Sequence, residues 1–170
     1  LPNYRLIDMG KDKWTKARDS LKMDGKLDEE FWTAYNYPRK LREFRTKGKP
    51  KNETLFMARW WNGSLYFGIR CEFDPTTPPV IGSKKNHDPA IWQGEHLELL
   101  IETNKNSYYQ IVVNPAGSVI DLDRGVPLRQ RKAYEWSSQA EAATHLDKDF
   151  WSAEIRLPVT SSDEDPLHQM

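Results

Sequence analysis

The sequence predicts an all-β protein: an antiparallel β-sandwich of the jelly-roll or immunoglobulin-like kind, with long loops and little helix. Three observations predict this class. Apolar and polar residues alternate in several short segments, which is the period of a strand buried on one side. Turn signals of the hairpin type join these segments, and no stretch has the pattern of a long amphipathic helix. The 170 residues suffice for one domain with a full hydrophobic core.

The N-terminal quarter is the least regular part of the chain. Residues 1–23 mix basic and apolar side chains and are predicted to form a lead-in arm, so the sandwich domain is placed at 24–170. Asp24-Gly25 predicts a turn, and 27–32 predicts a short helical turn. Residues 45–53 are cationic and contain Gly and Pro, and we interpret them as a solvated connection.

The clearest hairpin lies between residues 54 and 73. Asn62-Gly63 is the strongest short hairpin signal, and the turn it makes requires a positive φ at both residues. The strand before it alternates Phe56, Ala58 and Trp60 with the residues between them. The strand after it has period two, and one of its faces carries Leu65, Phe67, Ile69, Cys71 and Phe73.

The second half of the chain predicts five further strands: one at 96–102, one with Tyr109, Ile111 and Val113 on one face, and three at 119–123, 140–146 and 150–157. Long irregular loops at 74–90 and 124–139 separate some of them, and such loops often carry function. The polar tail at 160–170 looks like a loop before another strand, so the domain is expected to be truncated at its C-terminus. The side chains that we expect to find buried between the sheets are Phe67, Ile69, Leu97, Leu99, Ile111, Val113 and Ile155.

Composition excludes several classes of function. The 25 Lys and Arg balance the 25 Asp and Glu, so no global field attracts nucleic acid or an anionic membrane. No apolar run approaches the length of a membrane span. A single Cys71 excludes an internal disulfide framework and a Cys-based zinc site. We therefore expect neither a nucleic-acid partner nor a membrane span.

Tryptophan is the most informative residue type. The chain has seven, more than one small core usually requires, and sugar-binding surfaces use Trp faces to stack on pyranose rings. Trp92 ends a long loop and Trp136 lies in the polar loop, so both are candidate stacking platforms, with a core role as the alternative. Regular elements contain Trp32, Trp60 and Trp151, for which we expect core positions.

Acidic pairs are the other candidate chemistry. Asp121 and Asp123 share a strand face, about 7 Å apart at Cα. This spacing suits a structural Ca²⁺ site or a glycosidase pair, although a solvent-facing strand end explains it as well and is the favoured interpretation. Glu95 and Glu98 are three apart, so they point to opposite faces of a strand. Apart from the Ca²⁺ option, no cofactor is expected.

The order of several motifs carries a family resemblance. They are Asp24-Gly25-Lys26-Leu27-Asp28 leading to Trp32, Leu65-Tyr66 leading to Asp74, the run from Trp92 to Glu102, the Tyr-rich strand from Tyr108 to Gly117, and Trp151, Glu154 and Pro158. Together they span residues 24–158, and their succession resembles the family 9 carbohydrate-binding modules. Glu95 departs from the pattern, where Asp is usual.

The resemblance implies a non-catalytic module that targets an attached or partner polysaccharide-degrading enzyme to its glycan. It implies sugar held between two Trp side chains, the second of them in a later segment than this chain contains. Hydrogen bonds to the sugar are then expected from Glu95, Arg124 and Arg129. The family context implies a secreted or periplasmic protein whose signal peptide is not part of this chain.

Two other functions compete with carbohydrate binding. One is a b-type haem-binding electron-transfer domain, for which Met57, His87 and His96 are the candidate iron ligands. The other is a glycoside hydrolase that uses Asp121 and Asp123 or the Glu residues. The sequence contains no nucleophile elbow, phosphate loop or metal-binding His pair that favours another enzyme class.

Overall fold

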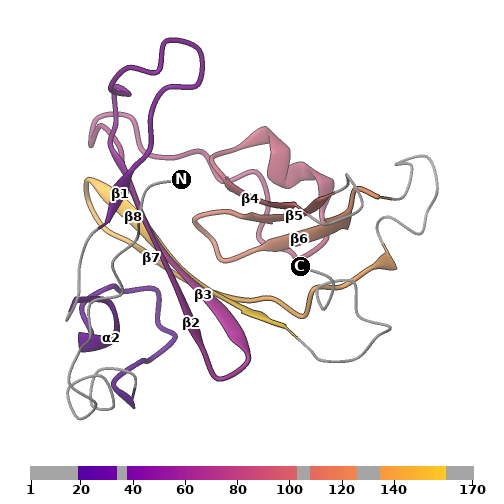
Figure 1. The fold of residues 1–170 in the computed structure, drawn as a ribbon. Coiled ribbons are helices and arrows are strands. Elements are labelled where there is room, and N and C mark those ends of the chain that lie inside the picture. Colours follow the sequence, from indigo (N-terminus) through magenta and orange to yellow (C-terminus); the bar gives the residue numbers. More distant parts are fainter. Residues whose placement is uncertain (1–18, 34–37, 103–107, 126–134, 160–170) are drawn as a thin grey trace.

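The computed structural model describes residues 19–33, 38–102, 108–125 and 135–159, and it confirms the all-β sandwich (Figure 1). A five-stranded antiparallel sheet, here sheet A, has the order β1-β2-β3-β8-β7, and a three-stranded antiparallel sheet, sheet B, has the order β4-β5-β6. The strands are β1 (Arg39–Lys40), β2 (Thr54–Trp61), β3 (Ser64–Glu72), β4 (Leu97–Glu102), β5 (Tyr108–Val113), β6 (Val119–Asp123), β7 (Glu141–Leu146) and β8 (Phe150–Pro158). The helical turns are α2 (Glu30–Thr33) and the 3-10 turn η1 (Pro89–Gln93).

The first hairpin has the predicted geometry. Asn62 and Gly63 have φ angles of 47° and 69°, and they join β2 to β3 in a register that pairs Trp61 with Ser64. β3 then pairs with β8 along its whole length, from Ser64 opposite Pro158 to Glu72 opposite Phe150. Because β8 comes last, the chain leaves sheet A after β3, builds sheet B, and returns.

The main core lies between the two sheets. It is formed by the inward residues of β3 and β8 packed against those of β5 and β6. Five of the seven predicted core residues are buried: Phe67, Ile69, Ile111, Val113 and Ile155. The other two, Leu97 and Leu99, are half-buried and pack against this core from β4, because β4 is an edge strand of the smaller sheet.

Two of the three predicted core tryptophans are in core positions. Trp32 and Trp151 are buried, but the prediction for Trp60 is wrong, because its side chain is 56% exposed. Phe56, on the same face of β2, still packs against the core. Trp60 lies at the far end of β2, beyond the stretch that β1 covers, and next to the turn. Alternation correctly assigns the face of a strand but does not show how far the opposing layer reaches.

The outer face of sheet A is covered by residues 21–32. Phe31 and Trp32 are completely buried there with Tyr66, and Leu21 packs against them. In Figure 1, α2 lies on the side of sheet A away from sheet B. Gly68 lies directly beneath Trp32, since a Cβ there would lie 3.0 Å from the indole ring, so that the ring would have to shift to admit it. Part of the predicted lead-in arm is therefore a second covering layer.

A buried carboxylate anchors this layer to the sheet. Glu154 points outward from β8 and is completely buried. Its two oxygens accept hydrogen bonds from Trp32 Nε1 (2.6 Å), the Asp24 amide (2.8 Å) and the Gly25 amide (2.8 Å). Burial raises the pKa of Glu154 to about 7, against the opposing effect of the Trp32 hydrogen bond.

This pKa predicts an inverted pH dependence of stability. The unfolded carboxyl ionises near its ordinary value of 4.5 and the folded one near 7, so the folded state binds the extra proton between these values. The free energy of unfolding should therefore fall as pH rises from about 4.5 to about 7 and level off above. Urea unfolding across this range measures it. Glu154→Gln should remove this component, whereas Glu141→Gln, at an exposed position, should retain it.

Candidate functional site

The outer face of sheet B is only partly covered. Val112, Ile120 and Leu122 point outward yet are buried, because η1 places Ile91 on top of them. Trp92 follows in the same turn, is half-buried, and packs against the same cluster. The 3-10 turn therefore holds an aromatic ring against the sheet with part of it in solvent.

The loop that carries Trp92 is held in place by specific contacts. The Asp88 carboxylate caps η1 by accepting hydrogen bonds from the Ala90 amide (3.0 Å) and from Ser83 Oγ (2.7 Å). The bond from the Glu95 amide to the Val80 carbonyl (2.7 Å) joins the segment after η1 to the segment before it. Trp92 therefore lies in a turn whose flanking loop segments are fixed by hydrogen bonds.

Beside Trp92, four polar side chains form a hydrogen-bonded line that we name the polar row: His96, Glu98, Gln110 and Arg124. His96 Nε2 lies 3.2 Å from Glu98 Oε1, and Gln110 Nε2 donates to Glu98 Oε2 at 2.8 Å. Arg124 Nε donates to Gln110 Oε1 at 2.5 Å. The imidazole of His96 meets the Trp92 ring edge to face at 5.4 Å between centroids. One row therefore runs from the aromatic ring across all three strands to the guanidinium.

The polar row is pre-arranged by its buried member. Gln110 is only 4% exposed, and both ends of its amide are used, one for a carboxylate and one for a guanidinium. Glu98 and Arg124 retain solvent-accessible surface and further hydrogen-bonding capacity. The row thus presents a carboxylate acceptor and a guanidinium donor at a fixed spacing, next to an aromatic face.

The structure places two of the predicted site residues on the outer face of sheet B: Trp92 contacts the His96 end of the polar row, and Arg124 forms its other end. The other predicted residues lie elsewhere. Glu95 is exposed and lines a different cavity of about 360 Å³ with Glu72 and Asp74. Trp136 stacks on Tyr109 at 4.5 Å and packs against the main core, so it contacts the opposite face of sheet B from Trp92. Arg129 lies outside the described residues.

Sequence reasoning missed Gln110 as a site residue. The alternation of Tyr109, Ile111 and Val113 already assigned position 110 to the outward face. It gave no sign that this glutamine joins Glu98 of one neighbouring strand to Arg124 beyond the other. The strand register, with Gln110 opposite both Leu100 and Leu122, provides that connection.

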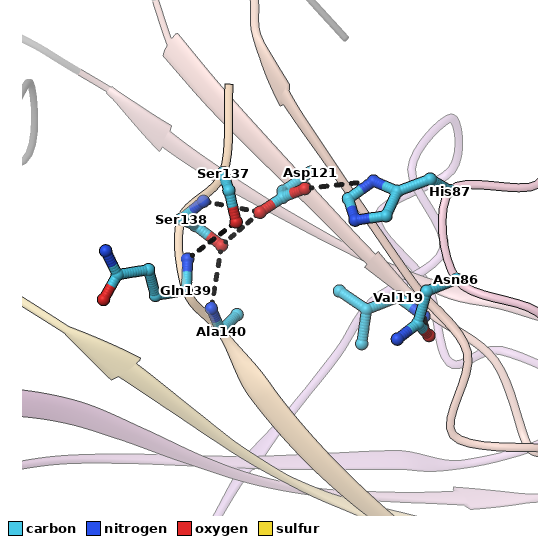
Figure 2. Close-up of polar contacts among 8 residues, drawn as sticks. All are labelled: Asn86, His87, Val119, Asp121, Ser137, Ser138, Gln139 and Ala140. Carbon is cyan, nitrogen blue, oxygen red and sulfur yellow. Dashed lines mark hydrogen bonds and ion pairs between the residues drawn. The ribbon is translucent and has the colours of Figure 1, made fainter. Parts of the chain in front are cut away.

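Asp121 is not at a solvent-facing strand end. It is 3% exposed and shares the inward face of sheet B with Ile111, which lies opposite it in register. Its carboxylate lies between Ser138 and His87 (Figure 2). Its Oδ2 accepts hydrogen bonds from the Ser138 amide and from Ser138 Oγ (2.8 Å), and its Oδ1 lies 3.5 Å from His87 Nδ1. Asp123 is half-buried and accepts a hydrogen bond from the Gly125 amide at 2.8 Å.

These contacts do not by themselves make a Ca²⁺ site. Ca²⁺ takes oxygen ligands, while the groups around Asp121 are an amide, a hydroxyl donor and an imidazole. Within the described ranges, no group of three or more His, Cys, Asp and Glu is close enough to hold a metal ion. The carboxylate instead links β6 to the segment before β7 and to the loop at His87.

The candidate haem ligands do not converge. Met57 packs in the cluster on the outer face of sheet A, with Trp32. His96 lies on the outer face of sheet B, and His87 is exposed beside Asp121. Met57 and His96 are therefore on opposite outsides of the sandwich and cannot ligate one iron.

Comparison with protein-family models, curated proteins and solved structures finds no significant match to this chain. In the part of the chain that the structure describes, no helix is long and apolar enough to cross a membrane.

The role assigned to Asp121 predicts a stability effect. Asp121→Ala leaves the buried Ser138 amide without its acceptor, which should lower the free energy of unfolding by about 1–3 kcal/mol. Asp123→Ala is the matched control and should change it by less than about 0.5 kcal/mol. Urea unfolding measures both. A melting temperature of the parent chain that falls with EDTA and recovers with Ca²⁺ would show that an ion is bound.

Proposed function

We propose that this chain binds carbohydrate without catalysis through the outer face of sheet B. One observation carries the proposal: a half-exposed Trp92 ring stands beside a polar row whose carboxylate, amide and guanidinium are already hydrogen-bonded to one another. A pyranose ring has an apolar C–H face and a rim of hydroxyl groups that both donate and accept. An aromatic face with fixed donors and acceptors beside it complements both parts.

Pre-arrangement of the polar row supports this proposal energetically. Binding normally costs about 0.5–1.5 kcal/mol for each long side chain that it immobilises. Gln110 already holds Glu98 and Arg124, so part of this cost is met during folding. Hydroxyl groups along a bound sugar then meet an acceptor and a donor that are in place.

The expected affinity is modest. A single stacking ring and a shallow row suit micromolar binding, which corresponds to about −8 kcal/mol at 1 μM. The family resemblance implies a second Trp on the other side of the sugar. Trp136 does not provide it from the described position, because it packs against the core side of sheet B.

The biological role that follows is targeting. We propose that the chain holds poly- or oligosaccharide for a tethered or partner polysaccharide-degrading enzyme, in a secreted or periplasmic setting. The resemblance to family 9 carbohydrate-binding modules supports this setting. Nothing in the geometry of the polar row favours the haem-binding or the hydrolase alternative.

Replacing the aromatic platform is the direct test. Trp92→Ala should weaken binding to the best sugar of a glycan array by about 1–3 kcal/mol, by analogy with aromatic stacking on bases. Trp60→Ala is the matched control, because it removes another exposed indole from the other sheet. Isothermal titration calorimetry and thermal melting together separate lost binding from lost fold. Equal affinities of the two variants would contradict the proposal.

The positioning role of Gln110 gives a second test. Gln110→Ala should weaken sugar binding by roughly ten-fold, about 1.4 kcal/mol, because Glu98 and Arg124 lose their common partner. Leu100→Ala, at a neighbouring exposed position of the same sheet face, is the control. If Gln110→Ala binds normally while its melting temperature falls, the amide serves the fold alone.

A further inference from the structure

A strongly basic segment comprises β1 and most of the connection from β1 to β2. The segment from Arg39 to Lys51, here named the basic loop, contains seven Lys and Arg against one Glu, in a chain whose total of 25 cationic residues equals its total of acidic ones. In Figure 1 the loop extends away from both sheets. The balanced composition of the whole chain therefore hides a local excess of positive charge.

Most of this charge is not neutralised within the fold. Lys40 pairs with Glu53 at 2.6 Å. Among the residues that the structure describes, no acidic side chain forms an ion pair with Arg42, Lys47 or Lys49. Like charges held together without counter-charge attract anions, and the attraction falls as salt is added.

The positive side chains surround a cavity. Its volume is about 820 Å³, which is within the range of ligand-binding pockets. Glu53 is the acidic residue in the lining. The cationic side chains in the lining are Arg39, Lys40, Arg42, Lys47 and Lys49. A concave surface of this charge fits a discrete anionic chain better than it fits a flat membrane.

The tip of the basic loop is a turn that is held by hydrogen bonds. The Glu43 carboxylate accepts hydrogen bonds from the amides of Arg45 (3.1 Å) and Thr46, and the Lys47 amide donates to the Glu43 carbonyl at 2.9 Å. The hydrogen bonds from Thr46 lower the pKa of Glu43. This carboxylate is therefore ionised, and its hydrogen bonds are made within the turn. Lys47 has a φ of 57°, a left-handed conformation that non-glycine residues rarely adopt.

An exposed aromatic ring stands at this tip. Phe44 is 83% exposed, the most exposed large apolar side chain among the described residues. Lys47 Nζ lies 4.6 Å from its ring centroid. A ring beside ammonium groups offers stacking to an apolar sugar face and ion pairing to an acidic group on the same sugar.

We propose that the basic loop is a second binding surface, for an acidic polysaccharide that carries carboxylate or sulfate groups. The choice of a glycan as the anionic chain rests on the proposed function, because the polar row offers a sugar site on the same molecule. The two surfaces differ in chemistry. The polar row contains the Glu98 carboxylate next to Trp92, while the basic loop contributes positive charge at the β1 edge of sheet A.

The test measures binding of the whole chain to polygalacturonate, heparin, a neutral glucan and vesicles with anionic lipid. We expect binding to at least one acidic polysaccharide, weakened several-fold as salt rises from about 0.01 to about 0.15 M. Arg42→Glu combined with Lys49→Glu should weaken it by about ten-fold or more. Polygalacturonate and heparin then distinguish carboxylate from sulfate as the preferred group.

Two controls make the result specific. Lys84→Glu with Lys85→Glu reverses two exposed charges elsewhere and should change the affinity by less than about two-fold. Phe44→Ala should weaken binding a few-fold without changing its salt dependence. The proposal is overturned if neither acidic polysaccharide binds, if both double variants lose binding equally, or if only the vesicles bind.

The same panel separates this inference from the proposed function. Trp92→Ala should weaken binding to neutral sugar as stated above and leave the salt-sensitive binding to acidic polysaccharide. If Trp92→Ala changes neither, the sugar site on sheet B is wrong while the basic loop result stands. If Arg42→Glu with Lys49→Glu leaves acidic polysaccharide binding unchanged, the basic loop is wrong while the sugar site stands.

Discussion

The constraint that shapes this protein is that both of its sheets carry large apolar side chains on both faces. The two sheets bury only their inner faces against each other. Outward-pointing Tyr66 on sheet A and Val112, Ile120 and Leu122 on sheet B still need to be removed from water. Short non-strand segments provide this cover, so the fold is a sandwich with a partial extra layer on each side.

The two covering layers are attached in different ways, and the difference matters for function. The layer over sheet A, with its buried Trp32, is fixed by a carboxylate, Glu154, that is completely buried and fully hydrogen-bonded. Such a group stabilises the layer only while its partners stay in place. The layer over sheet B is a single 3-10 turn, so it leaves part of the face open. The polar row lies in that open part, beside the ring of Trp92.

The charged side chains are distributed unevenly between the two sheets. The chain is neutral as a whole, but the basic loop concentrates positive charge at one edge of sheet A. The polar row on sheet B contains one negative side chain, Glu98, and one positive side chain, Arg124, so its charges nearly cancel. A ligand that carries both hydroxyl groups and acidic groups meets a different surface on each sheet. Net charge describes the chain as a whole and gives no information about a local excess of charge.

The amino-acid pattern alone was enough to predict the fold class, the Asn62-Gly63 turn and the inward faces of the strands, because side-chain alternation and turn chemistry are local properties. It also predicted Trp92 and Arg124 as site residues, and that stays a prediction. How far each layer reaches depends on the tertiary structure. For this reason Trp60 is exposed, Asp121 is buried and Trp136 packs against the core. The tertiary structure also decided which strands are neighbours, and so joined Gln110 to its partners. Those contacts depend on residues far apart in the chain, which no local pattern records.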